Sequence, residues 1–296
     1  MFRLRKFRFI AASLFCLLLL GVNAGANQSR DESIAEAAEL NNEAVVCVKD
    51  HHYDQAVELL KKAIALRPDL STGHYNLGRI YQLRNEFDLA IEEFEHAVDA
   101  NPNFVEALHE LGISYNKSGR YAEAVECLKR ALKLEPGRAD LLTELGFAYS
   151  KDGHIQEAVA IFQEAIRVKP DFGDAYNNLG VAYFKTGQVS GAIESLQQAI
   201  RLSPTMVVAH YNLGYALTQA KRRQQAIASY KQALALKPDF AEAHHNLAML
   251  YLQMGQRSLA LEEYHLLQSI DYEMSQKLFQ IIFRDKILDV REQGRE

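Results

Sequence analysis

The chain has 296 residues, of which 48% are hydrophobic and 24% are charged, and it contains six prolines and no tryptophan. This composition is sufficient for a buried core and excludes a chain made mainly of disordered linkers. The formal net charge of -5 argues against a nucleic-acid-binding protein, which would carry a basic patch.

Residues 1–26 have the pattern of a secretory signal peptide. A basic head precedes an uncharged apolar stretch over residues 9–22, and the small residues 24–26 follow it. We expect cleavage after Ala26 and export to the periplasm or beyond the cell, with membrane contact only in transit. An uncleaved membrane anchor is the alternative, although about 14 apolar residues are fewer than the roughly 20 that span a bilayer. The basic residues of the head are Arg3, Arg5, Lys6 and Arg8.

A lead-in over residues 27–36 precedes a repeat of 34 residues. Ser33 and Glu36 have the spacing of a capping box, which predicts that the first helix begins there. All six prolines lie 34 residues apart, at Pro68, Pro102, Pro136, Pro170, Pro204 and Pro238. With proline at position 32, residues 37–274 divide into seven units: 37–70, 71–104, 105–138, 139–172, 173–206, 207–240 and 241–274. Position 20 is alanine in every unit.

Within each unit the apolar residues follow the period of two successive helices. Positions 4, 7, 8 and 11 share a face of the first helix, and positions 20, 24, 27 and 28 share a face of the second. Glycine at position 15 of four units favours the left-handed conformation that ends a helix, and the prolines end the second helix. Each helix pair must pack on its neighbours to bury both apolar faces, so the units should stack.

Several of these positions also carry a family resemblance. The run Tyr-Asn-Leu-Gly-Arg-Ile-Tyr from Tyr75 to Tyr81, followed by Asp-Leu-Ala-Ile-Glu from Asp88 to Glu92, resembles the tetratricopeptide repeat (TPR) family, in particular exported proteins of bacterial type. The resemblance covers residues 37–274. It implies an all-α fold, a right-handed α-solenoid (superhelix) of seven helix-turn-helix repeats followed by a C-terminal capping helix.

The capping helix should come from residues 275–296, after a seventh unit that has Tyr272 in place of the proline. We expect an amphipathic helix over residues 275–290 that covers the last apolar face, as solenoids require. Binding of a partner by this helix is the alternative. Its apolar residues are Leu278, Ile281, Ile282, Ile287 and Leu288.

No residue pattern indicates catalysis. The sequence has no HExxH, glycine-rich phosphate loop, nucleophile elbow or CxxC pair. His74, His210 and His244 share position 4, where a histidine buried in the core is expected. Cys127 should lie on the outer face with an inert thiol, two repeats from Cys47 and too far for a disulfide. We therefore expect no enzyme, no cofactor and no metal site.

Positions 2, 5, 6, 9, 12 and 13 share the face of the first helix that is turned away from the second helix. In the TPR family this face lines a concave groove that receives a peptide or a helix of another protein. Position 6 is asparagine in five units, and such a row resembles the groove of the TPR region in O-linked N-acetylglucosamine transferases. The amides could hold the backbone of an extended peptide, or they could bond one helix to the next. The sequence leaves both interpretations open.

Charged residues add a pattern in units three to five. Acids recur at positions 2 and 6, and Lys117, Lys151 and Lys185 occupy position 13. The acids could steer a basic ligand, but salt bridges between acids and lysines of adjacent repeats are the favoured interpretation. The candidate partner-binding residues are therefore Asn76, Arg79, Asn177, Asn178, Tyr211, Asn212 and Asn246, with the acids Glu106, Glu110 and Glu144.

These patterns predict a non-catalytic scaffold for protein–protein interaction that binds a peptide or a helix of its partner in the groove. Two alternatives share the same fold. The first is an assembly factor of a cell-envelope machine such as a pilus or a secretion complex. The second is a recognition subunit for a separate enzyme such as a glycosyltransferase.

Overall fold

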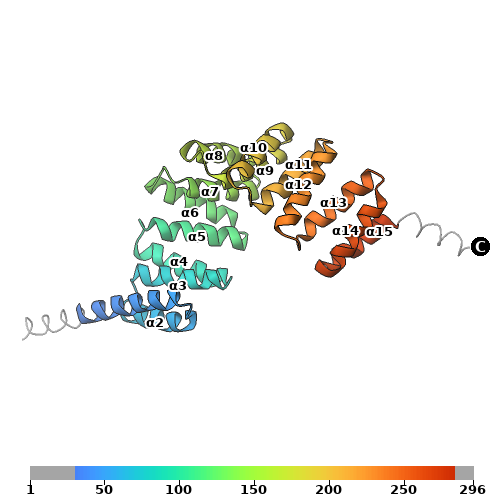
Figure 1. The fold of residues 1–296 in the computed structure, drawn as a ribbon. Coiled ribbons are helices and arrows are strands. Elements are labelled where there is room, and N and C mark those ends of the chain that lie inside the picture. Colours follow the sequence, from blue (N-terminus) through green and yellow to red (C-terminus); the bar gives the residue numbers. More distant parts are fainter. Residues whose placement is uncertain (1–30, 284–296) are drawn as a thin grey trace, which may run out of the picture. The chain divides into compact units, whose positions relative to one another are not determined.

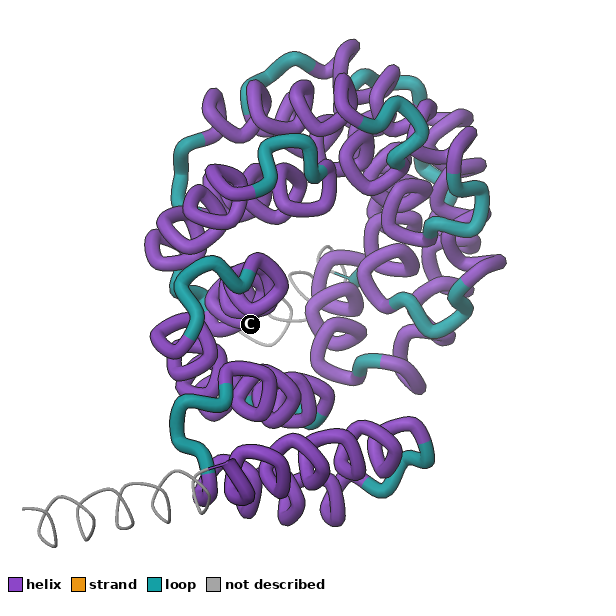
Figure 2. The backbone as a smooth tube through the Cα atoms, turned by 90° about the vertical axis from the view of Figure 1, so that its left-hand side faces the viewer, coloured by secondary structure: helices purple, strands orange, loops and turns teal. Residues whose placement is uncertain are grey.

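The computed structural model describes residues 31–283. The predicted signal peptide, its cleavage site and the end of the predicted capping helix lie outside these residues. Within them the backbone consists of helices joined by short loops, with no strand (Figure 2). No helix in this part of the chain has the length and apolar character needed to cross a membrane. The expected fold class, an all-α solenoid of helical repeats, is confirmed.

The chain divides into two compact units between Glu135 and Pro136, a division that the sequence pattern does not predict. In each unit the helices follow one another in chain order (Figure 1). The first unit contains a helix over residues 31–49, then α2 (Tyr53–Leu66), α3 (Ser71–Leu83), α4 (Phe87–Ala100), α5 (Val105–Ser118) and α6 (Tyr121–Leu134). The second unit contains α7 (Ala139–Lys151), α8 (Ile155–Val168), α9 (Gly173–Lys185), α10 (Val189–Leu202), α11 (Val207–Gln219), α12 (Arg223–Leu236), α13 (Ala241–Gln253), α14 (Arg257–Ile270) and α15 (Tyr272–Ile282).

Two helices of one repeat pack closely because small residues lie at their contact. The alanine at position 20 is fully buried in every repeat. Position 8 is glycine in five repeats, where a large side chain of the second helix faces it: a Cβ on Gly78 would lie 2.8 Å from the ring of Phe94, and a Cβ on Gly214 equally close to the ring of Tyr230. A methyl group at either position would therefore push the two helices apart.

The turn between the two helices has the same geometry in all seven repeats. Position 15 adopts a positive φ throughout, including φ of 80° at Gly119 and 92° at Gly153. The sequence predicts this conformation only where the residue is glycine. His51, Asn85 and Lys221 adopt it as well, with φ of 62°, 59° and 59°. The repeat framework thus imposes a conformation that costs a non-glycine residue about 1 kcal/mol or more.

Both ends of the repeat array differ from the sequence prediction. The chain is already helical at residue 31, so Ser33 lies inside a helix and cannot be its N-cap, and the lead-in of residues 27–36 is partly helical. At the other end α15 begins at Tyr272 rather than at residue 275, because the Asp271 carboxylate accepts the Met274 backbone N–H at 2.9 Å. Leu278 is buried as expected.

Candidate partner-binding face

The asparagines of the predicted binding face bond one repeat to the next. In the first unit the Asn76 amide donates to Oδ1 of Asn41 at 2.9 Å. In the second unit Asn212 donates to Oδ1 of Asn177 at 3.0 Å, and Asn177 donates to Oδ1 of Asn178 at 3.3 Å. Each bond between repeats joins position 6 of one first helix to position 5 of the preceding one.

A third bond between repeats follows the same rule, since Asn246 donates to the Tyr211 hydroxyl oxygen at 3.0 Å. These contacts favour the interpretation that the asparagine row holds helices together. Sequence reasoning missed the acceptors at position 5, although Asn41, Asn177 and Tyr211 are all polar there. A search for polar residues 35 positions before each asparagine would have found them.

Two of the predicted residues, Tyr211 and Asn212, line a cavity of about 270 Å³ between α9 and α11 in the second unit. Phe184 and Tyr215 meet edge to face at its wall, with ring centroids 5.0 Å apart. Tyr211 is held in place by Phe240, whose ring centroid lies 5.0 Å away. Tyr215 is 41% exposed, so an aromatic surface faces the solvent at this point. The remaining lining residues are Gly180, Val181, Lys185 and Leu196.

Two further candidate residues, Asn76 and Arg79, line a cavity of about 230 Å³ in the first unit. It lies between the helix of residues 31–49 and α3, and its lining also includes Val45, Lys49 and Leu60. These residues occupy the repeat positions of Val181, Lys185 and Leu196 in the second unit. The two cavities are therefore the same structural feature of the repeat, four repeats apart.

The lysines of the face do not form the expected salt bridges in the second unit. Lys185 donates to the backbone oxygen and the hydroxyl of Ser150 at 3.2 and 3.0 Å, and Lys151 lies 5.4 Å from the ring centroid of Phe147. Within the described residues, neither lysine has a carboxylate partner. Burial, with repulsion from Lys151, lowers the pKa of Lys185. The interpretation of paired acids and lysines is wrong for these two side chains.

The candidate acids differ in their exposure and in their partners. Glu110 is half-buried and accepts a hydrogen bond from Gln82 at 3.0 Å, whereas Glu106 is exposed to solvent. Glu144 is half-buried on α7. Asp140 pairs with Arg138 at 2.6 Å.

The histidines at position 4 are buried, as expected. Nδ1 of His74 lies 2.7 Å from Oε2 of Glu93, and Nδ1 of His244 lies 2.6 Å from Oε2 of Glu263. The other ring nitrogen of each lies 2.9 Å from a proline carbonyl oxygen. The Glu263 hydrogen bond raises the pKa of His244. For His74, burial opposes the charged form, but the bonds to Glu93 and the carbonyl outweigh it and raise the pKa.

Cys127 is not on the outer surface as predicted. It is 5% exposed, its thiol donates to the backbone oxygen of Leu108 at 3.1 Å, and burial raises its pKa to about 12. The thiol lies beside a cavity of about 520 Å³ between α4 and α6. Both described cysteines are free thiols. No three histidine, cysteine or acidic side chains gather as metal ligands anywhere in residues 31–283.

Solved structures with the same fold include proteins of diverse origin. The Cut9-Hcn1 complex of the APC/C matches with a TM-score of 0.68 and 20% identity over 81% of this chain, which spans about half (48%) of that chain. A TPR protein of Parabacteroides merdae matches with a TM-score of 0.70 and 16% identity over 84% of this chain and 99% of its own. YrrB, described as a TPR protein with an unusual peptide-binding site, matches with a TM-score of 0.54 and 24% identity over 62% of this chain and 94% of its own. Identities this low show the fold alone.

Models of protein families identify the family to which this chain belongs. Among curated proteins, no sequence matches this chain. Models described as tetratricopeptide or TPR repeats match residues 48–112 and 149–201, 104–171, 182–221 and 216–255, and 241–273. Together they cover residues 48–273 without a gap, which is well over half of the chain. With the repeat geometry in both units, these matches show that the chain belongs to the tetratricopeptide repeat family.

Proposed function

We propose that this protein is a non-catalytic scaffold that binds a peptide or a helix of a partner protein. The TPR fold is typical of protein–protein interaction scaffolds. The binding surface is the first-helix face, which consists of positions 2, 5, 6, 9, 12 and 13 of each first helix. The observation that supports this choice most directly is the cavity between α9 and α11, lined by Phe184, Tyr211 and Tyr215.

The lining of this cavity suits a single large side chain of a partner. Its walls are mainly apolar, and Asn212 places a polar group at the same site. Ligand sites in proteins commonly combine apolar walls with a few placed polar groups. Burial of one large apolar side chain contributes about 1.5–3 kcal/mol, which is enough to anchor a short segment. Tyr215 is the natural hot-spot residue because it is aromatic and partly exposed.

A selection from a library of random peptides displayed on phage tests this proposal. We expect the full-length chain to recover peptides whose affinity falls at least about tenfold in Tyr215→Ala, since the anchoring contact is lost. Tyr272→Ala is the matched control, because Tyr272 is a 68% exposed aromatic residue on α15 outside the cavity. Peptides that bind both variants as well as the wild type, or a failure to recover any, would reject the proposal.

We also propose that the protein acts outside the cytoplasm. The support is the pattern of residues 1–26, in which a basic head, an apolar stretch and small residues follow one another. N-terminal sequencing of the protein recovered from its native cells should begin at residue 27. A chain that retains its initial residues in the cytoplasmic fraction would contradict export, and the same chain in the membrane fraction would indicate an uncleaved anchor.

A further inference from the structure

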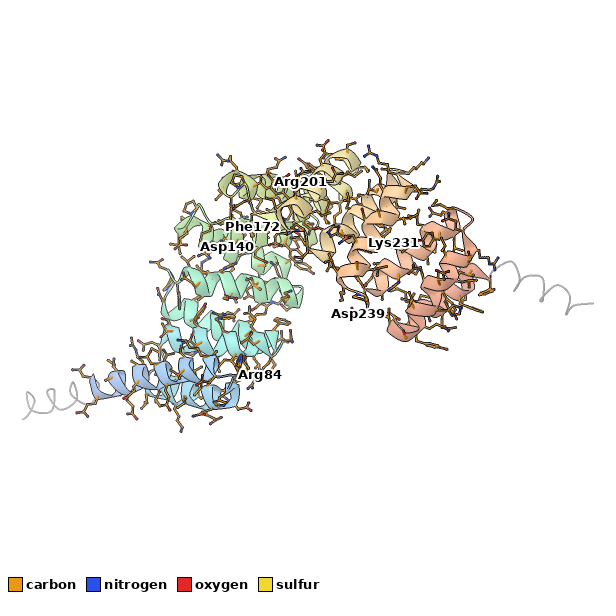
Figure 3. All side chains as sticks on the ribbon, in the orientation of Figure 1. Arg84, Asp140, Phe172, Arg201, Lys231 and Asp239 are labelled. Carbon is orange, nitrogen blue, oxygen red and sulfur yellow. The ribbon has the colours of Figure 1, made fainter. Side chains whose placement is uncertain are left out.

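Residues 221–237, which include the whole of α12, form a basic segment in the second unit. They contain five lysines or arginines and no acidic residue, and all five basic side chains are exposed. Three of them lie at the N-terminal end of α12, Lys231 lies in its middle (Figure 3), and one follows its C-terminal end. Since α12 has 14 residues, positive charge extends over about 21 Å. The five are Lys221, Arg222, Arg223, Lys231 and Lys237.

The charge of the basic segment is not neutralised by its surroundings in the second unit. Within residues 31–283, none of the five side chains forms an ion pair. The helices that pack on α12 are α11 and α13, and they contain one acid between them, Glu242. Along the chain, no acid occurs between Glu194 and Asp239. The basic segment therefore presents positive charge to the solvent in a chain whose net charge is -5.

In the first unit, α4 carries the opposite charge. It contains five acids and no lysine or arginine. Asp88, Glu92, Glu95 and Asp99 follow the spacing i, i+4, i+7 and i+11, which places them within a sector of about 60° around the helix. All four are exposed, so they form an acidic stripe about 16 Å long on the surface of α4. The fifth acid, Glu93, is the partner of a buried histidine.

The acidic stripe is also left without cationic partners. Three of its four acids form no ion pair within the described part of the chain. The fourth, Glu95, accepts a hydrogen bond from the Tyr115 hydroxyl and keeps its charge. The helices that pack on α4 are α3 and α5, and they contain one basic residue each, Arg79 and Lys117. The basic residues of these helices are therefore fewer than the acids of the stripe.

A cavity adjoins the acidic stripe. Glu95 and Asp99 line the cavity of about 520 Å³ between α4 and α6. Its lining also includes the apolar residues Val98 and Leu111 and a single basic residue, Arg130. Lysine and arginine side chains pack their aliphatic stems on apolar surface and keep their charged ends at polar groups. The cavity can therefore receive one long basic side chain beside the stripe.

We propose that the basic segment of one copy of this protein docks on the acidic stripe of a second copy. The two surfaces have opposite charge and similar length, and both lie on second helices. An anionic membrane would account for the basic segment alone, whereas a second copy accounts for both surfaces. Because the two surfaces differ, the contact is heterologous, and copies assemble into an open chain or a closed ring. This inference goes beyond the proposed function, since neither surface includes a residue of the first-helix face.

Sedimentation velocity of the full-length chain, at several protein and salt concentrations, tests this inference. We expect species larger than a monomer, whose fraction rises with protein concentration and falls as salt is added. Arg222→Glu/Arg223→Glu should weaken the association about tenfold or more, and Asp88→Lys/Glu92→Lys by a similar factor. In each variant alone, the two surfaces carry like charge. An equal mixture of the two variants should associate again, because both contacts between unlike copies then join opposite charges.

Lys61→Glu/Lys62→Glu is the matched control, because it makes the same change of charge at two exposed lysines of α2, outside both surfaces. Circular dichroism establishes that each variant is folded. A monomeric wild type, an association that neither variant weakens, or a mixture that fails to associate would overturn the inference. Flotation of a monomeric wild type with phosphatidylserine vesicles, lost in Arg222→Glu/Arg223→Glu, would assign the basic segment to a membrane surface instead. None of these outcomes changes the expected binding of peptides to the first-helix face.

Discussion

The buried pair His244–Glu263 should make the stability of the second unit depend on pH in a defined direction. Nδ1 of His244 lies 2.6 Å from Oε2 of Glu263, and Nε2 lies 2.9 Å from the backbone oxygen of Pro238. A carboxylate and a carbonyl oxygen can only accept hydrogen bonds, so both ring nitrogens must carry a proton. The geometry therefore selects the charged imidazolium form, in agreement with the raised pKa of His244.

The magnitude and sign follow from burial and linkage. The side chains of His244 and Glu263 are 6% and 13% exposed, so solvent screens the pair little. A hydrogen bond between such charged groups contributes about 1.5–3 kcal/mol. Because the pKa of His244 is raised on folding, this contribution is fully present below the unfolded pKa of about 6.5 and is lost as the pH rises through the folded pKa. Glutamate is ionised throughout this window in the unfolded chain.

The perturbation is Glu263→Gln, and the assay is urea unfolding followed by circular dichroism from pH 6 to pH 9. We expect the variant to be less stable than the wild type by about 2 kcal/mol at pH 6, with the difference falling toward zero at pH 9. Glutamine can donate to the Nδ1 of a neutral ring, which removes the penalty at high pH. Glu262→Gln removes an exposed carboxylate on the same helix and should show no such dependence. A difference that stays constant or grows with pH would refute the imidazolium assignment.

Three further changes test other parts of the structure. Lys221→Gly should raise stability by about 0.5 kcal/mol in thermal unfolding. The strain of a lysine at φ of 59° costs more than the extra chain entropy that a glycine loses on folding. An unchanged or lower Tm would contradict this strain. Cys127 should resist iodoacetamide in the native chain and react fully in urea, as read by mass spectrometry, because burial raises its pKa to about 12; rapid native labelling would show an accessible thiol. Asn212→Ala should lower the free energy of unfolding by about 1 kcal/mol, because its bond to Asn177 is lost. Unchanged stability with lost peptide binding would instead assign this amide to the partner.

The sequence was sufficient to predict the helical repeat because its strongest constraints are local and repeated. The prolines mark the end of the second helix in the first six repeats, and small residues such as Gly78 mark where two helices touch. The turn was only partly predictable. Glycine at position 15 signals a left-handed residue, but Lys221 carries no such signal and adopts the conformation because the packed helices on both sides impose it.

The ends were less predictable because no repeat context constrains them. Ser33 and Glu36 match the capping-box pattern, yet the helix already contains residue 31, so the pattern alone did not determine where it starts. At the other end Asp271 is a good N-cap that the sequence reasoning passed over in favour of the repeat boundary. Local capping chemistry decided the position of α15, and the repeat period did not.

For the binding face, the sequence predicts which face of the helix a residue occupies, but it does not predict which side chain that residue contacts. The asparagines lie on the expected face, but only the structure shows that Asn212 is engaged with Asn177 of the preceding repeat. Acids at position 6 and lysines at position 13 of adjacent repeats suggested pairing, yet these positions are seven residues apart along the first helices, about 10 Å along the axis. The serine at position 12 of the preceding repeat is closer, and Ser150 takes the Lys185 bond.

Some repeat positions are alike in the two cavities and others differ, which explains how one repeat framework can form two different sites. Positions 8 and 24 keep small and leucine side chains in both cavities, so the backbone and the floor are alike. Position 12 differs, with Val48 in one and Phe184 in the other, as does position 9 of the following repeat, with Arg79 and Tyr215. Val48 and Phe184 also pack against hydrophobic core clusters, whereas Arg79 and Tyr215 are exposed, so the residue at position 9 can change at less cost in stability than the residue at position 12. Specificity in this protein should therefore be a property of each adjacent pair of first helices, and substitutions in one cavity should leave binding at the other unchanged.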